Sequence, residues 1–299
     1  MLKTAIEIDV LCVGHACYDL VFSVPHHPKT DEKLVADSLI SCGGGPAANA
    51  AITVSLLGLK AGFAGYLGHD IYGEKHVQEL MDNHVNTDFI VRGSNPTPLS
   101  TVIVKPDGSR ALINFKGNTQ ALAAGSIDFS AIHPRVILFD GHEPHVSVPL
   151  AHQARKAGIL TVLDAGSLHE GTLSLMPIVD HLVCSEKFAL QYAGDPALAL
   201  NRLAEFAPSV VITLGEQGLI WKQGQESGRL PAFQVKAIDT TGAGDAFHGA
   251  FAAGLCQPMS WLELLRYASA TGALCTTKTG ARTGLPDQKA VSALLAVTG

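Results

Sequence analysis

The 299-residue sequence is poor in charge and has no low-complexity linker. Asp, Glu, Lys and Arg make up 16% of the residues, with 21 basic against 27 acidic side chains and a net charge of −6. This mild acidity argues against a nucleic acid or an anionic membrane surface as the main partner. An apolar content of 47% is enough for a sizeable core and argues against disorder.

Paired cysteines and long apolar runs are also missing. The six cysteines stand singly, and none forms a C-x-x-C pair. A chain of this length does not need disulfides for stability. No apolar run approaches the length of a membrane span, and the first residues include acids where a signal peptide has its apolar core. We therefore expect a reduced, cytoplasmic protein with no nucleic-acid and no membrane partner.

The sequence does have a repeated alternation of short apolar runs, rich in β-branched residues, with helical patterns. Such alternation is typical of βαβ units, and it predicts an α/β fold with a mostly parallel sheet and helices on both faces. Nothing divides the chain into consecutive domains, so we expect one domain over residues 1–299. The expected strands are 10–13, 61–66, 136–139, 160–163, 181–184, 210–214 and 233–238. The expected helices are 70–83, 146–156, 243–255, 261–276 and 287–296.

Two stretches interrupt this alternation. Residues 34–41 resemble a strand with no helix before it. Residues 101–105 and 110–115 flank the turn sequence Pro-Asp-Gly-Ser and predict a β-hairpin. We expect the regions of about 16–41 and 97–118 to form a small accessory sheet, inserted in the domain as a lid over one end of it. The edge strands of this lid could pair with a second copy of the chain, which predicts a homodimer.

The most informative segment is Asp239–Ala250, which opens an alanine-rich helix. Small residues at Gly242, Ala243 and Gly244 allow backbone N–H groups of the first turn to face outward together and bind an anion. Asp245 lies beside this anion hole and can take a proton from a hydroxyl group that attacks a bound phosphate. A carboxylate at a helix N-terminus also tends to stay ionised. The alternative is an ordinary helix start, with glycine for packing and aspartate for capping.

This segment resembles the second signature of the PfkB, or ribokinase-like, carbohydrate kinases, D-T-x-G-A-G-D. Four other segments are similar to motifs of the same family and occur in the family's order. They are Val13-Gly14 with Asp19 five residues after the glycine, Cys42–Ala51, Gly65–Gly73 with the pattern G-x-x-G-x-D-x-x-G, and Thr213–Gly218 with the pattern T-L-G-x-x-G. The resemblance covers nearly the whole chain and implies a Rossmann-type sheet flanked by helices, with a small β-sheet lid.

The resemblance also implies a function, an ATP-dependent kinase that phosphorylates a hydroxyl group of a small sugar, a hexose-sized ketose or a pentose. Asp245 would be the general base, and Gly242, Ala243 and Gly244 would form the anion hole. Substrate hydroxyl groups would be held by Asp19, Gly43, Gly44 and Asn49. The nucleotide side would be lined by Thr213, Gly215, Gly218 and Ser269. Mg²⁺ would arrive with ATP.

Two sites depart from the family pattern. Asp239 and Thr241 match a monovalent-cation site at which K⁺ activates many members, but Gly284 stands where ribokinases usually have a serine ligand. Ser185 and Phe188 replace the Asn and Glu of an N-x-x-E motif that is linked to Mg²⁺ and phosphate. The family's metal ligands therefore do not carry over completely at these two places.

Other functions compete with the kinase. A nucleoside kinase shares the fold and the motifs, and a non-catalytic sugar sensor would share the fold. The segment Gly43–Ala48 also fits the dinucleotide fingerprint G-x-G-x-x-A, with Asp70 at 22 residues after it, as in an NAD-dependent Rossmann oxidoreductase. That fingerprint should follow the first strand, and here a βα unit's length of chain precedes it. The absence of G-x-x-x-x-G-K-[ST] excludes a P-loop kinase.

The sequence His142-Glu143-Pro144-His145 suggests a metal site, but it lacks the H-E-x-x-H spacing and Pro144 is expected to prevent the helix. We expect His142, with Asp140 and Glu143, to shape substrate choice at the end of a parallel strand, where ligands bind in open α/β sheets. Arg282 is an isolated charge and is expected at the surface.

Overall fold

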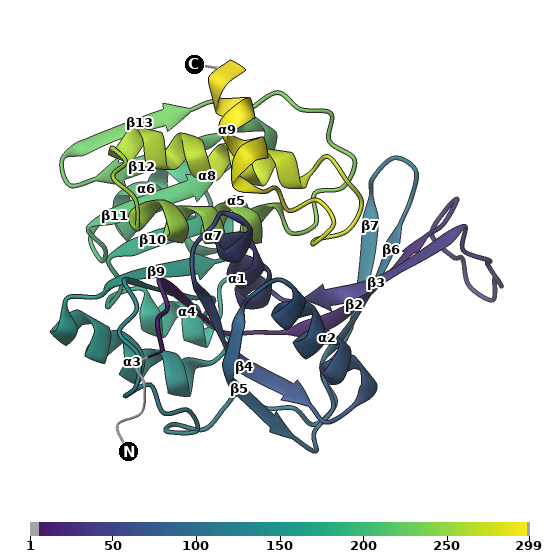
Figure 1. The fold of residues 1–299 in the computed structure, drawn as a ribbon. Coiled ribbons are helices and arrows are strands. Elements are labelled where there is room, and N and C mark those ends of the chain that lie inside the picture. Colours follow the sequence, from purple (N-terminus) through teal and green to yellow (C-terminus); the bar gives the residue numbers. More distant parts are fainter. Residues whose placement is uncertain (1–5, 298–299) are drawn as a thin grey trace.

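The computed structural model describes residues 6–297, and its central feature is a nine-stranded sheet in the order β13-β12-β11-β10-β9-β8-β1-β4-β5 (Figure 1). The seven strands from β11 to β5 run parallel, while β12 and β13 form an antiparallel edge. The strands are β1 (Val10–Val13), β4 (Ala61–Gly68), β5 (Asn86–Gly93), β8 (Val136–Phe139), β9 (Leu160–Ala165), β10 (His181–Ser185), β11 (Ser209–Thr213), β12 (Leu219–Gln223) and β13 (Glu226–Leu230).

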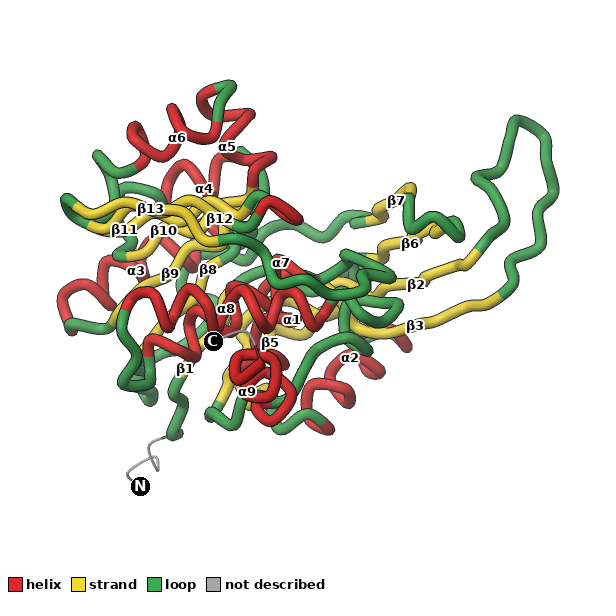
Figure 2. The backbone as a smooth tube through the Cα atoms, turned by 90° about the horizontal axis from the view of Figure 1, so that it is seen from above, coloured by secondary structure: helices red, strands yellow, loops and turns green. Residues whose placement is uncertain are grey.

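Helices cover both faces of this sheet. One layer contains α3 (Pro144–Ala157), α4 (Glu170–Leu175), α5 (Glu186–Ala193) and α6 (Pro196–Leu203). The opposite layer contains α1 (Pro46–Leu56), α2 (Ile71–Asp82), α7 (Ala243–Leu255), α8 (Trp261–Cys275) and α9 (Gln288–Val297) (Figure 2). Because both faces are covered, the inner strands β1 and β8 are apolar at every position rather than at alternate ones.

Strand β1 shows how one short run serves two cores. Its four residues are fully buried. Val10 and Cys12 pack in the core shared with α1, α7 and α8, whereas Leu11 and Val13 pack in the core shared with α3 to α6. Successive side chains of a strand point to opposite faces, so a run of four apolar residues supplies both layers.

A separate four-stranded sheet has the order β3-β2-β6-β7 and extends away from the main body (Figure 1). Its strands are β2 (Cys17–Ser23), β3 (Ser38–Gly44), β6 (Leu99–Val104) and β7 (Arg110–Phe115). The predicted hairpin is confirmed. The predicted strand 34–41 is displaced, because β3 begins at Ser38 and continues to Gly44, in register with β2 down to Cys17.

One further expectation about secondary structure is wrong. Residues 233–238 are not a strand, because the chain leaves the sheet edge after Leu230 and Pro231 and pairs with no other described strand. The segment is held instead by Ile238 and Asp239, whose N–H groups donate to the carbonyl of Thr276. Pro144 is the first residue of α3 and Glu143 is its N-cap, so His142 and Glu143 lie outside the helix, as expected. Proline is well tolerated at the first helical position, where its missing N–H would have no partner.

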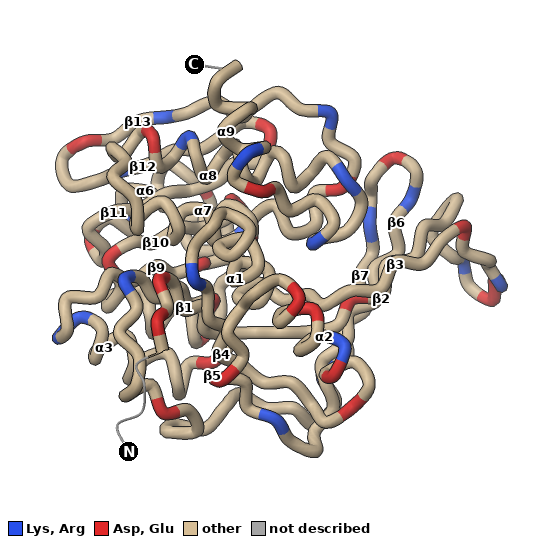
Figure 3. Tube along the Cα trace, in the orientation of Figure 1, with Lys and Arg blue, Asp and Glu red and all other residues tan. Residues whose placement is uncertain are grey.

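The charged residues are not concentrated on any one helix or strand. Lys and Arg are interspersed with Asp and Glu along the described trace (Figure 3). Within residues 6–297, no helix combines the length and the apolar character needed to cross a membrane.

Candidate active site

The N-terminal turn of α7 has the geometry of an anion-binding turn. Gly242 caps the helix with φ at 78°, and a Cβ atom there would lie 2.9 Å from the Cα of Ala281. Both the backbone conformation and the close approach therefore require glycine. Gly244 is exposed, and no heavy atom lies within 4 Å of the position of a Cβ. The outer side of the turn formed by Gly242, Ala243, Gly244 and Asp245 is open to a ligand.

Asp245 lies on this turn and points to the first glycine segment. Its Oδ2 accepts a hydrogen bond of 2.7 Å from Nδ2 of Asn49, which is on α1. Burial raises the pKa of Asp245, while the Asn49 hydrogen bond and the nearby His248 act to lower the pKa. The helix N-terminus was expected to keep this carboxylate ionised; desolvation acts in the opposite direction and is the larger effect.

The predicted sugar-binding residues come together through the pairing of β2 with β3. This pairing places Asp19 opposite Cys42. A Cβ atom at Gly44 would lie 2.2 Å from Oδ2 of Asp19, so only glycine leaves room for this carboxylate. Burial raises the pKa of Asp19, and the Cys17 thiol, which donates a hydrogen bond of 3.2 Å to Oδ1, lowers the pKa.

Arg282 was expected at the surface, and this expectation is wrong. Its exposed fraction is 9%, and it lies between α1 and α2. Nε donates to Oδ1 of Asn49 at 2.9 Å, and Nη1 lies 3.0 Å from Oε2 of Glu79. A buried cation needs such partners. The partners lie more than 200 residues away in sequence, so no local pattern could have identified the site of Arg282.

Three imidazole rings lie where β1, β8 and β9 end. His142 stacks on His169 with 4.8 Å between ring centroids, and it lies 5.2 Å from His15. Burial lowers the pKa of His15 to about 4, helped by His142. We call His15, His142 and His169 the histidine wall. Asp140 fixes the backbone of this wall, because its carboxylate accepts hydrogen bonds from the backbone N–H groups of His15 and His142. Sequence reasoning selected His142 but missed His15 and His169, which no motif marks.

Glu143 does not face this wall. Its carboxylate accepts a hydrogen bond of 2.5 Å from the backbone N–H of Leu122 and is 6% exposed as a residue. The contact attaches the connection between the small sheet and β8 to the start of α3. Glu143 therefore holds this loop in place.

The predicted nucleotide residues lie around the end of β11. Thr213 is the last residue of this strand, and its hydroxyl donates to the carbonyl of Cys184 at 3.3 Å. Gly215 is exposed with φ at 57°. Gly218 has φ at 85°, and a Cβ there would lie 2.0 Å from the carbonyl oxygen of Leu230, so it serves a tight turn. Ser269 is half-buried on α8, which packs against α7.

The predicted monovalent-cation residues are already hydrogen-bonded. Oδ1 of Asp239 accepts from the N–H and hydroxyl groups of Thr241 at 2.9 and 2.7 Å, and Oδ2 accepts from the N–H of Gly280 at 2.8 Å. Arg110, at the start of β7, donates to the hydroxyl of Thr241 at 2.5 Å and lies 3.9 Å from Oδ1 of Asp239. The guanidinium group of Arg110, on the small sheet, therefore lies beside the anion-binding turn. The sequence did not indicate this contact.

The position of Ser185 and Phe188, and the metal site suggested by His142 to His145, can also be compared with the structure. Ser185 caps α5, accepting from the N–H of Phe188 at 3.0 Å and donating to the carbonyl of Gly166 at 2.8 Å. This position therefore has a structural role. Across residues 6–297, no three His, Cys, Asp or Glu side chains are grouped so that they could hold a metal ion.

The oxidoreductase alternative is contradicted by the position of Asp70. This residue caps α2, accepting from the N–H groups of Tyr72 and Gly73 at 3.0 and 2.8 Å. Its other oxygen accepts from the N–H of Thr97 at 2.7 Å. The carboxylate that should bind a ribose is thus occupied by the backbone. The glycine segment begins in the last two residues of β3 of the small sheet and does not follow the first strand of the main sheet.

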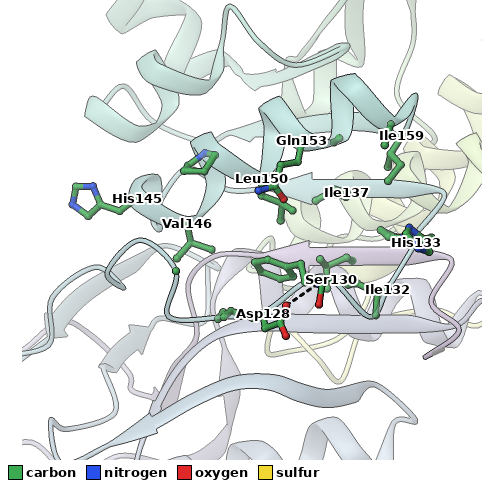
Figure 4. Close-up of a pocket in the computed structure, with 18 residues that line it drawn as sticks. Asp128, Ser130, Ile132, His133, Ile137, His145, Val146, Leu150, Gln153 and Ile159 are labelled. Carbon is green, nitrogen blue, oxygen red and sulfur yellow. Dashed lines mark hydrogen bonds between the residues drawn. The ribbon is translucent and has the colours of Figure 1, made fainter. Parts of the chain in front are cut away.

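An apolar cavity of about 400 Å³ lies elsewhere, between α3 and residues 125–134 (Figure 4). Leu150 and Ile137 line it, and the hydrogen bond between Asp128 and Ser130 lies at its edge. None of the predicted site residues lines this cavity. The groups that can do chemistry lie elsewhere, around the N-terminal turn of α7.

Comparisons with known proteins point to sugar kinases. Ribokinase of Lactococcus lactis is 26% identical over 296 residues, covering 96% of each chain. Fructokinase-2 of Zea mays is 28% identical, and the match covers 86% of each chain. The structure of Arabidopsis thaliana ribokinase with ribose and ATP superposes with a TM-score of 0.85 at 25% identity, over 97% of this chain and 99% of that one. The predicted ribokinase-like α/β fold is confirmed.

A family model described as pfkB family carbohydrate kinase matches residues 7–288. The match spans all five motifs, from Gly14 to the anion-binding turn. The chain therefore belongs to the pfkB family of carbohydrate kinases, which are phosphotransferases with an alcohol group as acceptor.

Proposed function

We propose that this protein transfers the γ-phosphate of ATP to a hydroxyl group of a small sugar, with Asp245 as the general base. One observation carries the proposal. The contact between Asn49 and Asp245 joins the sugar-binding glycine segment to the anion-binding turn, so that an acceptor hydroxyl, a base and a phosphate can meet at one point. Phosphoryl transfer depends mainly on such positioning and on charge stabilisation.

Each group then has a defined task. Asp19, Asn49 and the backbone of Gly44 bind hydroxyl groups of the sugar, because a carboxylate accepts and a carboxamide both accepts and donates hydrogen bonds. The N–H of Gly43 already donates to Oε2 of Glu79. Asp245 takes the proton from the attacking hydroxyl. The N–H groups of the first turn of α7 stabilise the negative charge of the transferred group. Mg²⁺ bound to the ATP phosphates offsets part of their charge.

The histidine wall supports a sugar as the acceptor. The lowered pKa of His15 keeps this imidazole neutral near pH 7, and a neutral imidazole can both donate and accept a hydrogen bond. His142 and His169 are stacked on the same wall. Neutral imidazoles can exchange hydrogen bonds with the hydroxyl groups of a polyol. An intact base and anion-binding turn argue against a non-catalytic sensor.

The small sheet is proposed to close as a lid over the end of the main domain that carries the site. Arg110 already contacts Thr241, and a Cβ at Gly108, in the hairpin turn, would lie 3.5 Å from the carbonyl oxygen of Ile238. A closed lid excludes water, which would otherwise hydrolyse ATP.

K⁺ activation at Asp239 and Thr241 competes with the charge of Arg110, which lies 3.9 Å from Oδ1 of Asp239. Comparing turnover in K⁺ and tetramethylammonium salts tests the site. A large K⁺ effect supports a cation beside Asp239, and equal rates show that Arg110 suffices.

The outer face of the small sheet is proposed to pair with a second copy of the chain. Strand register places Leu39, Ile113 and Phe115 on this one face, with exposed fractions of 55%, 64% and 53%. The edge strands β3 and β7 lie beside it, and unpaired edges favour pairing with another chain. The proposed setting is the cytoplasm, where free thiols such as the six buried cysteines stay reduced.

The decisive experiment measures ADP release from ATP and Mg²⁺ with pentoses, hexoses, ketoses, sugar acids and nucleosides as acceptors. Turnover on a sugar that falls by about 10²–10⁴-fold in Asp245→Asn, with binding retained, supports the proposal. Turnover on nucleosides alone would identify the alternative kinase. Sugar binding with no turnover on the whole panel would identify a sensor.

A further inference from the structure

Arg282 has no role in the mechanism above, although it is a deeply enclosed cation close to the base. It lies on the segment that follows α8, in neither a helix nor a strand, and its side chain is 5% exposed. Burying a guanidinium group is energetically costly unless its N–H groups find hydrogen-bond or ion-pair partners. The side-chain partners that it finds in the described structure lie on α1 and α2.

The contact with Asn49 determines which way the carboxamide is turned. Nε of Arg282 lies 2.9 Å from Oδ1 of Asn49. A guanidinium only donates hydrogen bonds, so the carboxamide atom that faces it has to be the oxygen. The amide nitrogen is then directed to Asp245, whose carboxylate only accepts. Turning the amide over would place an NH₂ group against a cation and a carbonyl against a carboxylate.

The other side of the guanidinium is fixed independently. Nη2 lies 2.5 Å from Nε2 of His76, which must act as an acceptor and therefore belongs to a neutral ring. Burial and the charge of Arg282 both lower the pKa of His76. Oε2 of Glu79 forms an ion pair with Nη1 at 3.0 Å, and it accepts a hydrogen bond of 2.6 Å from the N–H of Gly43. Arg282 is thus held by α2 while it holds Asn49.

The first glycine segment is built around this side chain. A Cβ atom at Gly43 would lie 2.1 Å from Nη1 of Arg282 and 2.5 Å from the ring of His76. Only glycine at this position leaves room for the guanidinium. A continuous path of contacts therefore runs from the sugar-binding backbone through Glu79, Arg282 and Asn49 to the base.

We propose that Arg282 is a positioning residue for phosphoryl transfer: it orients the Asn49 carboxamide so that Nδ2 holds Oδ2 of Asp245 and Oδ1 of Asp245 is left to take the proton of the acceptor hydroxyl. The proposal rests on the proposed function for the identity of the step. The Asn49 hydrogen bond is the largest influence that lowers the pKa of Asp245 against its burial. If the Asn49 carboxamide loses this orientation, the pKa of Asp245 rises and the base stays protonated up to a higher pH. Asp245 is then also no longer aligned with the acceptor hydroxyl.

Other charged and titratable groups also surround Asp245, and a substitution at Arg282 replaces none of them. They are His248 on α7, Asp19 and Cys17 on β2, Asp140 after β8, Asp164 on β9 and Cys275 on α8. Asp19 lies within the field of Arg282, so the titration of Asp245 has to be observed directly.

The test compares Arg282→Gln and Arg282→Lys with the matched control Arg92→Lys. Arg92 is a partly buried arginine that binds two backbone carbonyls and a carboxylate of α2, and none of these partners belongs to the path of contacts from Gly43 to Asp245. The Arg282 variants are expected to lower kcat by about 10- to 100-fold with a smaller change in KM, the cost of a misaligned catalytic group. The acidic limb of the kcat profile should move to higher pH, and Arg282→Lys should recover part of the loss. The control should change thermal stability only.

A second measurement does not depend on turnover. The ¹³C signal of the Asp245 carboxyl carbon, assigned by its loss in Asp245→Asn, is titrated in wild type and in Arg282→Gln. A titration midpoint that moves up in the variant supports the proposal. An unmoved midpoint, or a loss of kcat that only follows loss of folded protein as in Arg92→Lys, would overturn it. If wild type turns over no sugar, the proposed function fails, while the titration still decides the role of Arg282.

Discussion

Nδ2 of Asn49 donates a 2.7 Å hydrogen bond to Oδ2 of Asp245, although 196 residues separate the two in sequence. Asn49 belongs to the glycine segment proposed to bind the sugar, and Asp245 to the turn proposed to bind phosphate. The bond lowers the pKa of Asp245, and burial raises it by a larger amount. The balance between the two determines the pH range in which the base is ready.

The acidic limb of the kcat/KM profile should therefore lie above the ordinary aspartate range. The base has to be ionised, and a raised pKa means that its proton is lost only at higher pH. Activity should fall as the pH drops through that raised pKa. Initial rates between about pH 4 and pH 8 give the limb, and in Asn49→Leu it should move further up. A limb at the ordinary value of aspartate in both proteins contradicts the prediction.

Gly44→Ala should raise the KM for the sugar by at least about tenfold, the usual effect of a misplaced binding group. Its methyl group would lie 2.2 Å from Oδ2 of Asp19 and would push this carboxylate out of place. Gly93→Ala is the control, because its methyl group meets only the movable ring tip of Tyr66 at 3.1 Å. Steady-state kinetics at saturating ATP separate the two variants. Equal KM values would show that Asp19 does not bind the sugar.

Arg110→Gln should weaken ATP more than sugar. The variant removes the cation that contacts Thr241 beside the anion-binding turn. Since the side chain is partly exposed, the expected increase in the KM for ATP is modest, about three- to tenfold. The increase should shrink when wild type and variant are compared at high salt, which screens the charge. A change in the KM for the sugar alone would place Arg110 on the other substrate.

Glu143→Gln should remove part of the pH dependence of stability. Burial raises the pKa of Glu143 to about 7, against a hydrogen bond from Leu122 that lowers it. The folded protein therefore holds this proton more tightly than the unfolded chain. The resulting stability is fully present below about pH 4.5 and is lost as the pH rises through about 7.

Glutamine keeps the carbonyl acceptor and cannot ionise. Near pH 8.5 the variant should be more stable than wild type by up to about 3 kcal/mol, with little difference near pH 4.5. Urea unfolding at both pH values measures this, and an equal difference at both would contradict the prediction.

Ile113→Lys should give a monomer if the small sheet pairs with a second copy. Ile113 is 64% exposed on the face that also carries Leu39 and Phe115. A charge there would have to be desolvated in the interface. Light scattering gives the mass of wild type, of this variant and of Leu262→Lys, a control at a 49% exposed position on α8. A wild-type monomer would refute the dimer directly.

Much of the fold follows from local patterns. The run Val10–Val13, the hairpin strand Arg110–Phe115 and the helix Ala243–Leu255 are observed with the predicted bounds, because apolar periodicity and turn residues act over a few positions. The segment Asp239–Asp245 is equally local. Its small residues and its acid are adjacent in the chain, so the amino-acid sequence alone predicts the anion-binding turn and the proposed base.

Tertiary structure decided what depends on distant partners. The strand expected at residues 233–238 had the right composition but no neighbour to pair with at that place in the described structure. Arg282 looked like an isolated surface charge, and only the packing of α1, α2 and the segment after α8 gives it Asn49, His76 and Glu79 as partners. A strand needs another strand and a buried cation needs acceptors. Such partners are set by chain topology, which brings together residues that no local window contains.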